Sequence, residues 1–177
     1  GREVCFLKCT AATVVFTLTI DDALPIDSQD GLTGIEHPCL TTVGEILRIK
    51  YNDSLTNLDG LSSLTTVGAS LNIESNNALT NIDGFSSLTD VGGGLYIVEN
   101  YTLTNIDGLS NITTVGGILS ISYNDALTNL NALSSVTTVG ESLYFYENIS
   151  LCQSLVDAFF ALFPDNYTDS YGNNDDC

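Results

Sequence analysis

The hydrophobic positions of this chain repeat every 24 residues, without an insertion, from Val43 to Leu151. Each repeat begins with a Val-Gly pair, has a Leu-x-Ile or Leu-x-Phe segment four positions later, and then has an Asn and a Leu at constant distances. The initial valines are Val43, Val67, Val91, Val115 and Val139. A constant period of about 20 to 50 residues indicates a solenoid, in which each repeat forms one coil that stacks on the previous coil. We therefore predict a solenoid whose equivalent positions align in columns.

The Leu-x-Ile segments predict the strands of this solenoid, because inward and outward side chains alternate in a short strand with one buried face. Stacked coils would pair these strands into a parallel sheet at about 4.8 Å per coil. The Asn after each strand is predicted to be buried, since a sharp bend leaves backbone groups inside the core that need partners. This column comprises Asn52, Asn76, Asn100, Asn124 and Asn148.

A second bend in each coil is predicted at the recurring Asp-Gly pairs, where glycine would take a positive backbone angle and aspartate would bond nearby amides. The pairs are Asp59-Gly60, Asp83-Gly84 and Asp107-Gly108. The fourth repeat has Asn131-Ala132 instead, so we expect a less regular turn there.

The ends of the chain differ from the regular coils, as expected for the caps that a repeat protein needs. We predict one solenoid domain over residues 1–177, with an N-terminal cap and degenerate coil over 1–42, regular coils over 43–150 and a C-terminal cap over 151–177. Leu32 to Ile35 repeats residues 55 to 58 one position out of step, and alternation up to Ile20 predicts a strand. Ser150 to Phe163 predicts an amphipathic helix that buries Leu151, Leu155, Phe159 and Leu162.

The columns between Val91 and Leu109, Val-Gly-Gly-Gly-Leu-Tyr-Ile-Val-Glu-Asn-Tyr-Thr-Leu-Thr-Asn-Ile-Asp-Gly-Leu, resemble the receptor L-domain family, which is related to leucine-rich repeats. The resemblance covers roughly residues 30 to 155 and implies a mainly β, right-handed β-solenoid. Members of that family occur in ectodomains of growth-factor and insulin receptors and in microbial surface proteins, where they bind partners or build the cell surface. Hormone binding is not implied, because the chain has no Trp, no cysteine-rich module and no second L domain.

Charge excludes one class of partner. The chain has 4 basic and 22 acidic residues, which gives a net charge of −18 and repels a nucleic-acid backbone. All the basic residues, Arg2, Lys8, Arg48 and Lys50, lie within the first 50 positions. We therefore expect no nucleic-acid partner, and unlike ends on the solenoid.

The cysteines lie in the two predicted caps, which favours an extracellular protein whose ends are held by disulfides. We expect Cys152 to pair with Cys177, whereas the pairing of Cys5, Cys9 and Cys39 stays open and leaves one thiol for another chain if the other four pair. Gly at position 1 and the absence of Met suggest a chain from which a signal peptide has been removed. The Thr-rich segment from Thr10 to Ile20 is too short to insert into a membrane.

The outward side of the predicted strands is the candidate partner-binding face, because a solenoid with coils of equal length has one flat side. Tyr and Arg are also favoured at interfaces. The candidates are Arg48, Lys50, Tyr96, Val98, Tyr144 and Tyr146. The competing interpretation is that these are ordinary exposed residues with high strand propensity.

We expect no catalytic residue, no cofactor and no metal site. The single histidine, His37, lies in the irregular first coil, and turn chemistry explains the aligned Asp59, Asp83 and Asp107, although calcium binding by that column stays open. Asn111 and Asn166 are the candidate glycosylation sites, since the other three Asn-x-Ser/Thr motifs start at asparagines predicted to be buried.

Two functions remain. The first is a non-enzymatic extracellular recognition or adhesion module that binds a protein or glycan through its strands. The second is a structural subunit that assembles head-to-tail with identical subunits into an extracellular filament or surface layer, which the unlike ends and the odd cysteine count favour.

Overall fold

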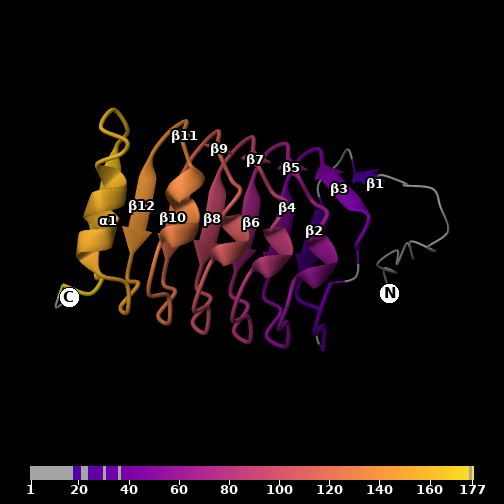
Figure 1. Ribbon diagram of the computed structural model, residues 1–177. Coiled ribbons are helices and arrows are strands. Elements are labelled where there is room, and N and C mark those ends of the chain that lie inside the picture. Colours follow the sequence, from indigo (N-terminus) through magenta and orange to yellow (C-terminus); the bar gives the residue numbers. More distant parts are fainter. Residues whose placement is uncertain (1–17, 21–23, 30, 36, 176) are drawn as a thin grey trace.

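The computed structural model describes residues 18–20, 24–29, 31–35, 37–175 and 177. Successive repeats stack into an elongated, mainly β molecule with two parallel sheets that run along its length (Figure 1). The predicted 24-residue stacking is confirmed, since Leu71 pairs with Leu95 and Leu95 with Leu119. The fold is therefore solenoid-like.

The predicted Leu-x-Ile strands form the larger sheet, which has seven strands. In spatial order they are β2 (Leu24–Asp27), β4 (Leu47–Lys50), β6 (Leu71–Glu74), β8 (Leu95–Val98), β10 (Leu119–Ser122), β12 (Leu143–Tyr146) and β13 (Thr168–Tyr171). The first and third residues of the strands from β4 to β12 are fully buried, as their alternation predicts. We call the outward side of this sheet the strand face.

A second sheet, which the repeat pattern did not predict, is formed mainly by short segments that end at the repeat valines. Its order is β1 (Leu18–Ile20), β3 (Leu40–Val43), β5 (Thr66–Val67), β7 (Asp90–Val91), β9 (Thr114–Val115) and β11 (Thr138–Val139). The repeat valines point into the core. Threonine hydroxyls join neighbouring coils, as where Thr65 Oγ1 donates to the carbonyl oxygen of Thr41 at 2.9 Å. Threonine side chains therefore help to join neighbouring coils along this sheet.

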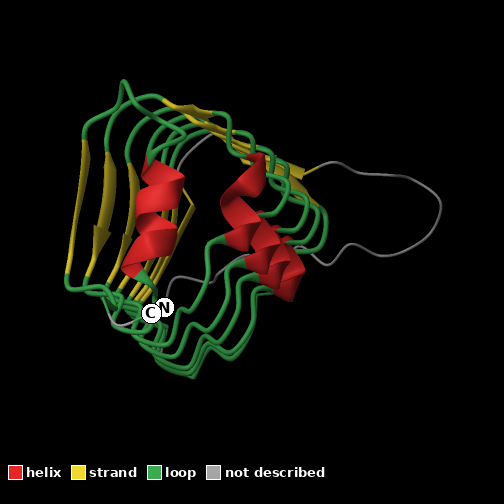
Figure 2. Cartoon of the chain, turned by 60° about the vertical axis from the view of Figure 1, so that its left-hand side comes forward, coloured by secondary structure: helices red, strands yellow, loops and turns green. Residues whose placement is uncertain are grey.

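The Asp-Gly bends are short 3-10 helices on a separate side of the stack (Figure 2). They are η1 (Asp59–Leu61), η2 (Asp83–Phe85), η3 (Asp107–Leu109) and η4 (Asn131–Ser135). The expected positive angle at their glycines is wrong. These glycines are required by close packing, since a Cβ atom on Gly84 would lie 1.9 Å from the carbonyl oxygen of Leu58 in the previous coil.

The positive backbone angles lie instead directly after the strands of the larger sheet. Among the described non-glycine residues they belong to Ser28, Tyr51, Ser75, Glu99, Tyr123 and Glu147, with φ between 52° and 58°. In the regular coils the buried Asn directly follows this left-handed residue. Each of these coils therefore bends where its strand of the larger sheet ends.

The buried asparagines form a continuous hydrogen-bonded ladder, as predicted. Asn100 Nδ2 donates to the carbonyl oxygen of Ile73 at 3.0 Å, and Asn100 Oδ1 accepts from the backbone N–H of Asn76 at 3.1 Å. The same pattern recurs from Asn52 to Asn148, all of which are fully buried. Asn173 in the C-terminal cap completes the ladder, because its Oδ1 accepts from the Asn148 backbone at 3.2 Å.

The first coil is confirmed as a displaced copy of the others. Leu24 pairs with Leu47, and Gly34 bridges to Asn57, so both pairs are 23 residues apart where regular coils are offset by 24. The end of the predicted N-terminal strand is β1, which pairs in parallel with β3. Positions before Leu18 lie outside the described residues.

The predicted C-terminal helix forms α1 (Gln153–Phe160), but the predicted inward face is partly wrong. Val156, Phe159 and Phe163 are buried, whereas Leu155 and Leu162 are 39% and 61% exposed. Phe145 of β12 contacts Phe159 and Phe160, with 5.8 and 5.4 Å between ring centroids, so aromatic packing against the sheet sets the rotation of the helix.

The predicted disulfide between Cys152 and Cys177 ties the C-terminal end of the chain to the start of α1, with a Cα–Cα distance of 5.7 Å. Cys39 is also disulfide-bonded, whereas Cys5 and Cys9 lie outside the described residues. No helix among the described residues has the length and apolar content that a membrane crossing requires.

Gly84→Ala is expected to lower the free energy of unfolding by about 2 to 3 kcal/mol, because the new methyl group would overlap backbone of the coil below. The matched control is Ala132→Gly, since the fourth repeat already has a buried alanine at the equivalent position and η4 is longer there. That control should cost about 1 kcal/mol for the lost methyl group. Urea denaturation measures both, and equal losses would contradict the close-packing explanation.

Asn100→Ala is expected to cost about 3 kcal/mol, because it leaves the Asn76 N–H buried without an acceptor and removes a hydrogen bond to the Ile73 carbonyl. Asn77→Ala is the control, since Asn77 is an exposed residue whose amide bonds the Asp53 side chain at 2.8 Å. Its loss should change stability by less than about 0.5 kcal/mol. Unfolding midpoints that fall equally in the two variants would refute a structural role specific to the ladder.

Candidate functional site

The strand face presents two outward columns of side chains. The first column is Pro25, Arg48, Asn72, Tyr96, Ser120, Tyr144 and Asp169, and the second is Asp27, Lys50, Glu74, Val98, Ser122, Tyr146 and Tyr171. All six predicted partner-binding residues therefore lie on this face. The register aligns them because each coil repeats the same backbone path.

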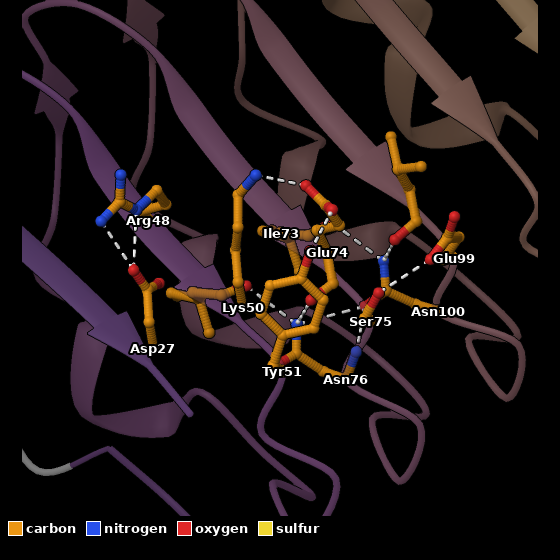
Figure 3. A network of polar contacts seen from close by, with 12 residues as sticks. Asp27, Arg48, Lys50, Tyr51, Ile73, Glu74, Ser75, Asn76, Glu99 and Asn100 are labelled. Carbon is orange, nitrogen blue, oxygen red and sulfur yellow. Dashed lines mark hydrogen bonds and ion pairs between the residues drawn. The ribbon is translucent and has the colours of Figure 1, made fainter. Parts of the chain in front are cut away.

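The N-terminal half of the strand face is a network of ion pairs and hydrogen bonds (Figure 3). Arg48 pairs with Asp27, with 2.7 Å between its guanidinium and the carboxylate, and Lys50 pairs with Glu74. Such exposed pairs add little stability, but they neutralise both cations. Arg48 and Lys50 thus serve contacts between neighbouring strands.

Hydrogen bonds extend this network toward the next coils. Tyr51 donates its hydroxyl to Glu74 Oε1 at 3.1 Å, and Ser75 donates to Glu99 Oε2 at 2.9 Å. The hydrogen bond to Glu74, followed by the negative charge of that carboxylate, raises the pKa of Tyr51. Acidic side chains therefore accept most of the polar contacts on this half of the face.

The C-terminal half of the strand face has a cluster of five tyrosines, which we call the tyrosine patch: Tyr123, Tyr144, Tyr146, Tyr167 and Tyr171. The rings of Tyr146 and Tyr171 stack with centroids 4.5 Å apart, and Tyr144 stacks on Tyr146 at 5.7 Å. Tyr144 also meets Tyr167 edge to face at 6.1 Å, and Tyr123 lies close enough to Tyr171 for that hydroxyl to raise the pKa of Tyr123. Four of the five rings are therefore held by contacts with other rings.

The tyrosine patch is open to solvent. Tyr167 is 63% exposed, Tyr171 52% and Tyr123 38%. Tyrosines that are fixed by ring contacts and yet exposed offer apolar area with little conformational entropy left to lose on binding. The patch is thus a partly exposed aromatic surface with restricted side-chain freedom.

Carboxylates lie within and beside the tyrosine patch. Tyr146 donates its hydroxyl to Asp169 Oδ2 at 3.1 Å. Glu147 folds over the end of β13, since a Cβ atom on Gly172 would lie 2.5 Å from its carboxyl carbon. The charges of Glu147 and Glu99 both act on Tyr123, whose pKa is raised mainly by its hydrogen bond to Tyr171.

Tyr96 lies on β8, so that β10 separates it from Tyr144 and Tyr146 on β12. A Cβ atom on Gly94 would lie 2.4 Å from the Tyr96 ring, so the absence of a side chain at Gly94 lets the ring rest on the backbone. Strand β10 has only Ser120 and Ser122 in its outward columns. Short side chains therefore separate Tyr96 from the tyrosines of β12.

Three tyrosines of the patch were not among the predicted candidates. Tyr123 occupies the left-handed position after β10, and a column drawn through Tyr51 and Tyr123 would have indicated it. Tyr167 and Tyr171 were not predicted, because β13 follows β12 at an offset of 25 residues and so does not continue the 24-residue columns.

The remaining predicted residues lie elsewhere. His37 is buried, which lowers its pKa, and its backbone lies beside Gly60 of η1. Asp59, Asp83 and Asp107 are exposed, and no group of three or more metal-ligating side chains occurs in the described part of the chain.

The two candidate glycosylation sites differ in their surroundings. Asn111 is exposed and donates to the carbonyl oxygen of Ser86 at 2.8 Å. Asn166 donates to the carbonyl oxygens of Val139, at 2.7 Å, and of Glu141, and so covers the end of the smaller sheet. Glycosylation at either residue stays a prediction.

Alkaline titration tests the environment of the tyrosine patch. Burial, and then the hydrogen bond to Asp169 and the charge of that carboxylate, raise the pKa of Tyr146 well above its ordinary value of 10.0. The stabilisation from its protonated form should persist below pH 10 and be lost as pH rises from there through the raised pKa. Phenolate absorbance should show a last step that Tyr146→Phe removes and Asp169→Asn moves to lower pH. A titration curve that neither substitution alters would contradict this environment.

Comparison with known proteins gives no match from which a function could be transferred. No protein-family model, curated protein or solved structure matches the chain. The resemblance to the receptor L-domain family rests on the repeat columns and remains a proposal. The distribution of charge and aromatic rings over the strand face is therefore the basis for a functional conclusion.

Proposed function

We propose that this protein is a non-enzymatic extracellular recognition module that binds a protein or glycan partner through its strand face. The observation that carries this proposal is the tyrosine patch, in which exposed rings of one face are fixed against one another. Tyrosine is enriched at the energetic centres of interfaces because it combines apolar area with a polar tip. The competing interpretation as ordinary strand residues does not explain why they cluster at one end.

The rigidity of the support favours the same proposal. Neighbouring strands are joined through the larger sheet, and the asparagine ladder fixes the bend after each strand. Binding groups that are placed on regular strands are held more precisely than groups on loops. A partner would therefore meet a surface that needs little reorganisation.

We further propose right-handed coils of the receptor L-domain and leucine-rich-repeat type. Parallel strands of one sheet are joined by right-handed connections in nearly all proteins. The 24-residue columns and the parallel pairing of equivalent positions support this assignment. The disulfides at both ends support an extracellular location, since such bonds persist in oxidising compartments.

A second candidate is the structural subunit that assembles head-to-tail. The order of the larger sheet ends at β13 and that of the smaller sheet at β11, both near the C-terminal cap. An end strand is a template for pairing with another chain. Light scattering across a concentration series tests this candidate, and a mass that stays monomeric would remove it.

The recognition proposal is tested by binding to arrays of glycans and of secreted proteins. The double variant Tyr144→Ala/Tyr146→Ala should lose at least about tenfold in affinity for a ligand that the unaltered protein binds, because truncating a central interface tyrosine costs about 1 to 2 kcal/mol or more. Tyr101→Ala is the control, since Tyr101 is 45% exposed and lies outside the tyrosine patch.

Melting temperatures of the variants establish that each one folds. Equal affinity of the patch variant and the control for every ligand would refute a role for this half of the strand face. Absence of binding on both arrays would count against the recognition module itself.

A further inference from the structure

We infer that the tyrosine patch recognises a basic segment of a protein partner, by holding an arginine or lysine side chain between aromatic rings and carboxylates. This inference rests on the proposed function and specifies the chemistry of its partner. It follows from three observations: the tyrosine rings, the carboxylates beside them, and the positions of the lysine and arginine side chains among the described residues.

The rings provide the first part of a cation site. A cation within about 6 Å of the centre of an aromatic face is attracted by the electrons of the ring. Tyr144, Tyr146 and Tyr171 stand side by side on two adjacent strands, with ring centroids 4.5 and 5.7 Å apart along the series. A flat cation can therefore extend this series by stacking on the outer face of Tyr171, which is 52% exposed.

Carboxylates provide the second part. Asp169 follows Tyr144 in the first column, and its Oδ2 accepts a hydrogen bond from Tyr146 of the second column at 3.1 Å. The carboxylate of Glu147 lies against Gly172, which directly follows Tyr171. A cation that is bound to the rings would thus also lie close to negatively charged carboxylates.

Charge complementarity excludes the opposite class of ligand. Among the described residues, the lysine and arginine side chains are those of Arg48 and Lys50, and both are paired with acids on the other half of the face. The chain has a net charge of −18, which would steer a basic partner toward it and repel sulfated or phosphorylated ligands. A neutral glycan could stack on the rings and donate its hydroxyls to the carboxylates, but the negative charge of the chain would not attract it.

Arginine should bind better than lysine. The guanidinium group is planar and weakly hydrated, so it can stack on a tyrosine ring while it donates two hydrogen bonds to a carboxylate. The ammonium group of lysine is compact and strongly hydrated. A preference for arginine would therefore indicate that rings and carboxylates act together.

The test uses three fluorescent Gly-Ser peptides that carry three Arg, three Lys or three Gln residues, with binding measured by anisotropy at low salt. We expect the Arg peptide to bind several-fold more tightly than the Lys peptide, and the Gln peptide not to bind. The double variant Asp169→Asn/Glu147→Gln should weaken binding of the Arg peptide about tenfold. Tyr146→Leu/Tyr171→Leu should abolish the preference for Arg over Lys.

A charge-matched control separates the tyrosine patch from the overall charge of the protein. Asp59→Asn/Asp83→Asn removes the same two negative charges from exposed positions on the side of the 3-10 helices, where the fourth repeat already has Asn131. We expect it to change affinity for the Arg peptide by less than twofold. Equal weakening by both charge variants would show that only net charge is sensed, and would overturn the inference.

The remaining outcomes distinguish the inference from the proposed function. Binding of a neutral glycan that Tyr144→Ala/Tyr146→Ala abolishes and Asp169→Asn/Glu147→Gln leaves intact would refute the basic partner but keep the recognition module. Failure of the Arg peptide to bind the unaltered protein would refute the basic partner alone. Absence of binding by both the peptides and the arrays would refute both.

Discussion

The hydrogen-bonded ladder of buried asparagines is the interaction on which the rest of the structure depends. A left-handed residue bends the chain after each strand of the larger sheet, and this bend turns backbone groups toward the core. One asparagine per coil satisfies them, and its amide also bonds the equivalent asparagine of the next coil. Since an unpaired buried polar group costs about 1 to 3 kcal/mol, each coil has to bring its bend into line with the ladder. The end coils do so as well, although their offsets are 23 and 25 residues.

Fixed coil length makes the strand face a surface whose chemistry can vary while its backbone does not. Inward positions of the strands must be apolar because the core fully buries them, but outward positions are constrained only by their neighbours along the column. The two halves of the face illustrate this freedom. Arg48 and Lys50 pair with adjacent acids at one end, whereas tyrosines contact one another at the other.

Much of this architecture could be predicted from the sequence. The same structural requirement recurs in every coil, so the same type of residue appears at the same position of every repeat. The strands, the buried asparagines and the displaced first coil all followed from such columns. The smaller sheet did not, since most of its strands have only two residues, too few to show an alternation. Gly84 was assigned to the bend for the wrong reason, because packing against another coil leaves no local signal.

The C-terminal cap shows why the site was harder to predict than the fold. β13 and Asn173 continue the sheet and the ladder, but at an offset of 25 residues, so the repeat gives no indication of them. The same segment brings Asp169 and Tyr171 beside Tyr144 and Tyr146, and the Cys152–Cys177 disulfide fastens it. The same stretch of chain therefore ends the stack of coils and completes the tyrosine patch. Its irregular sequence meets two requirements that the regular repeats do not have: it closes the core, and it places charge among aromatic rings.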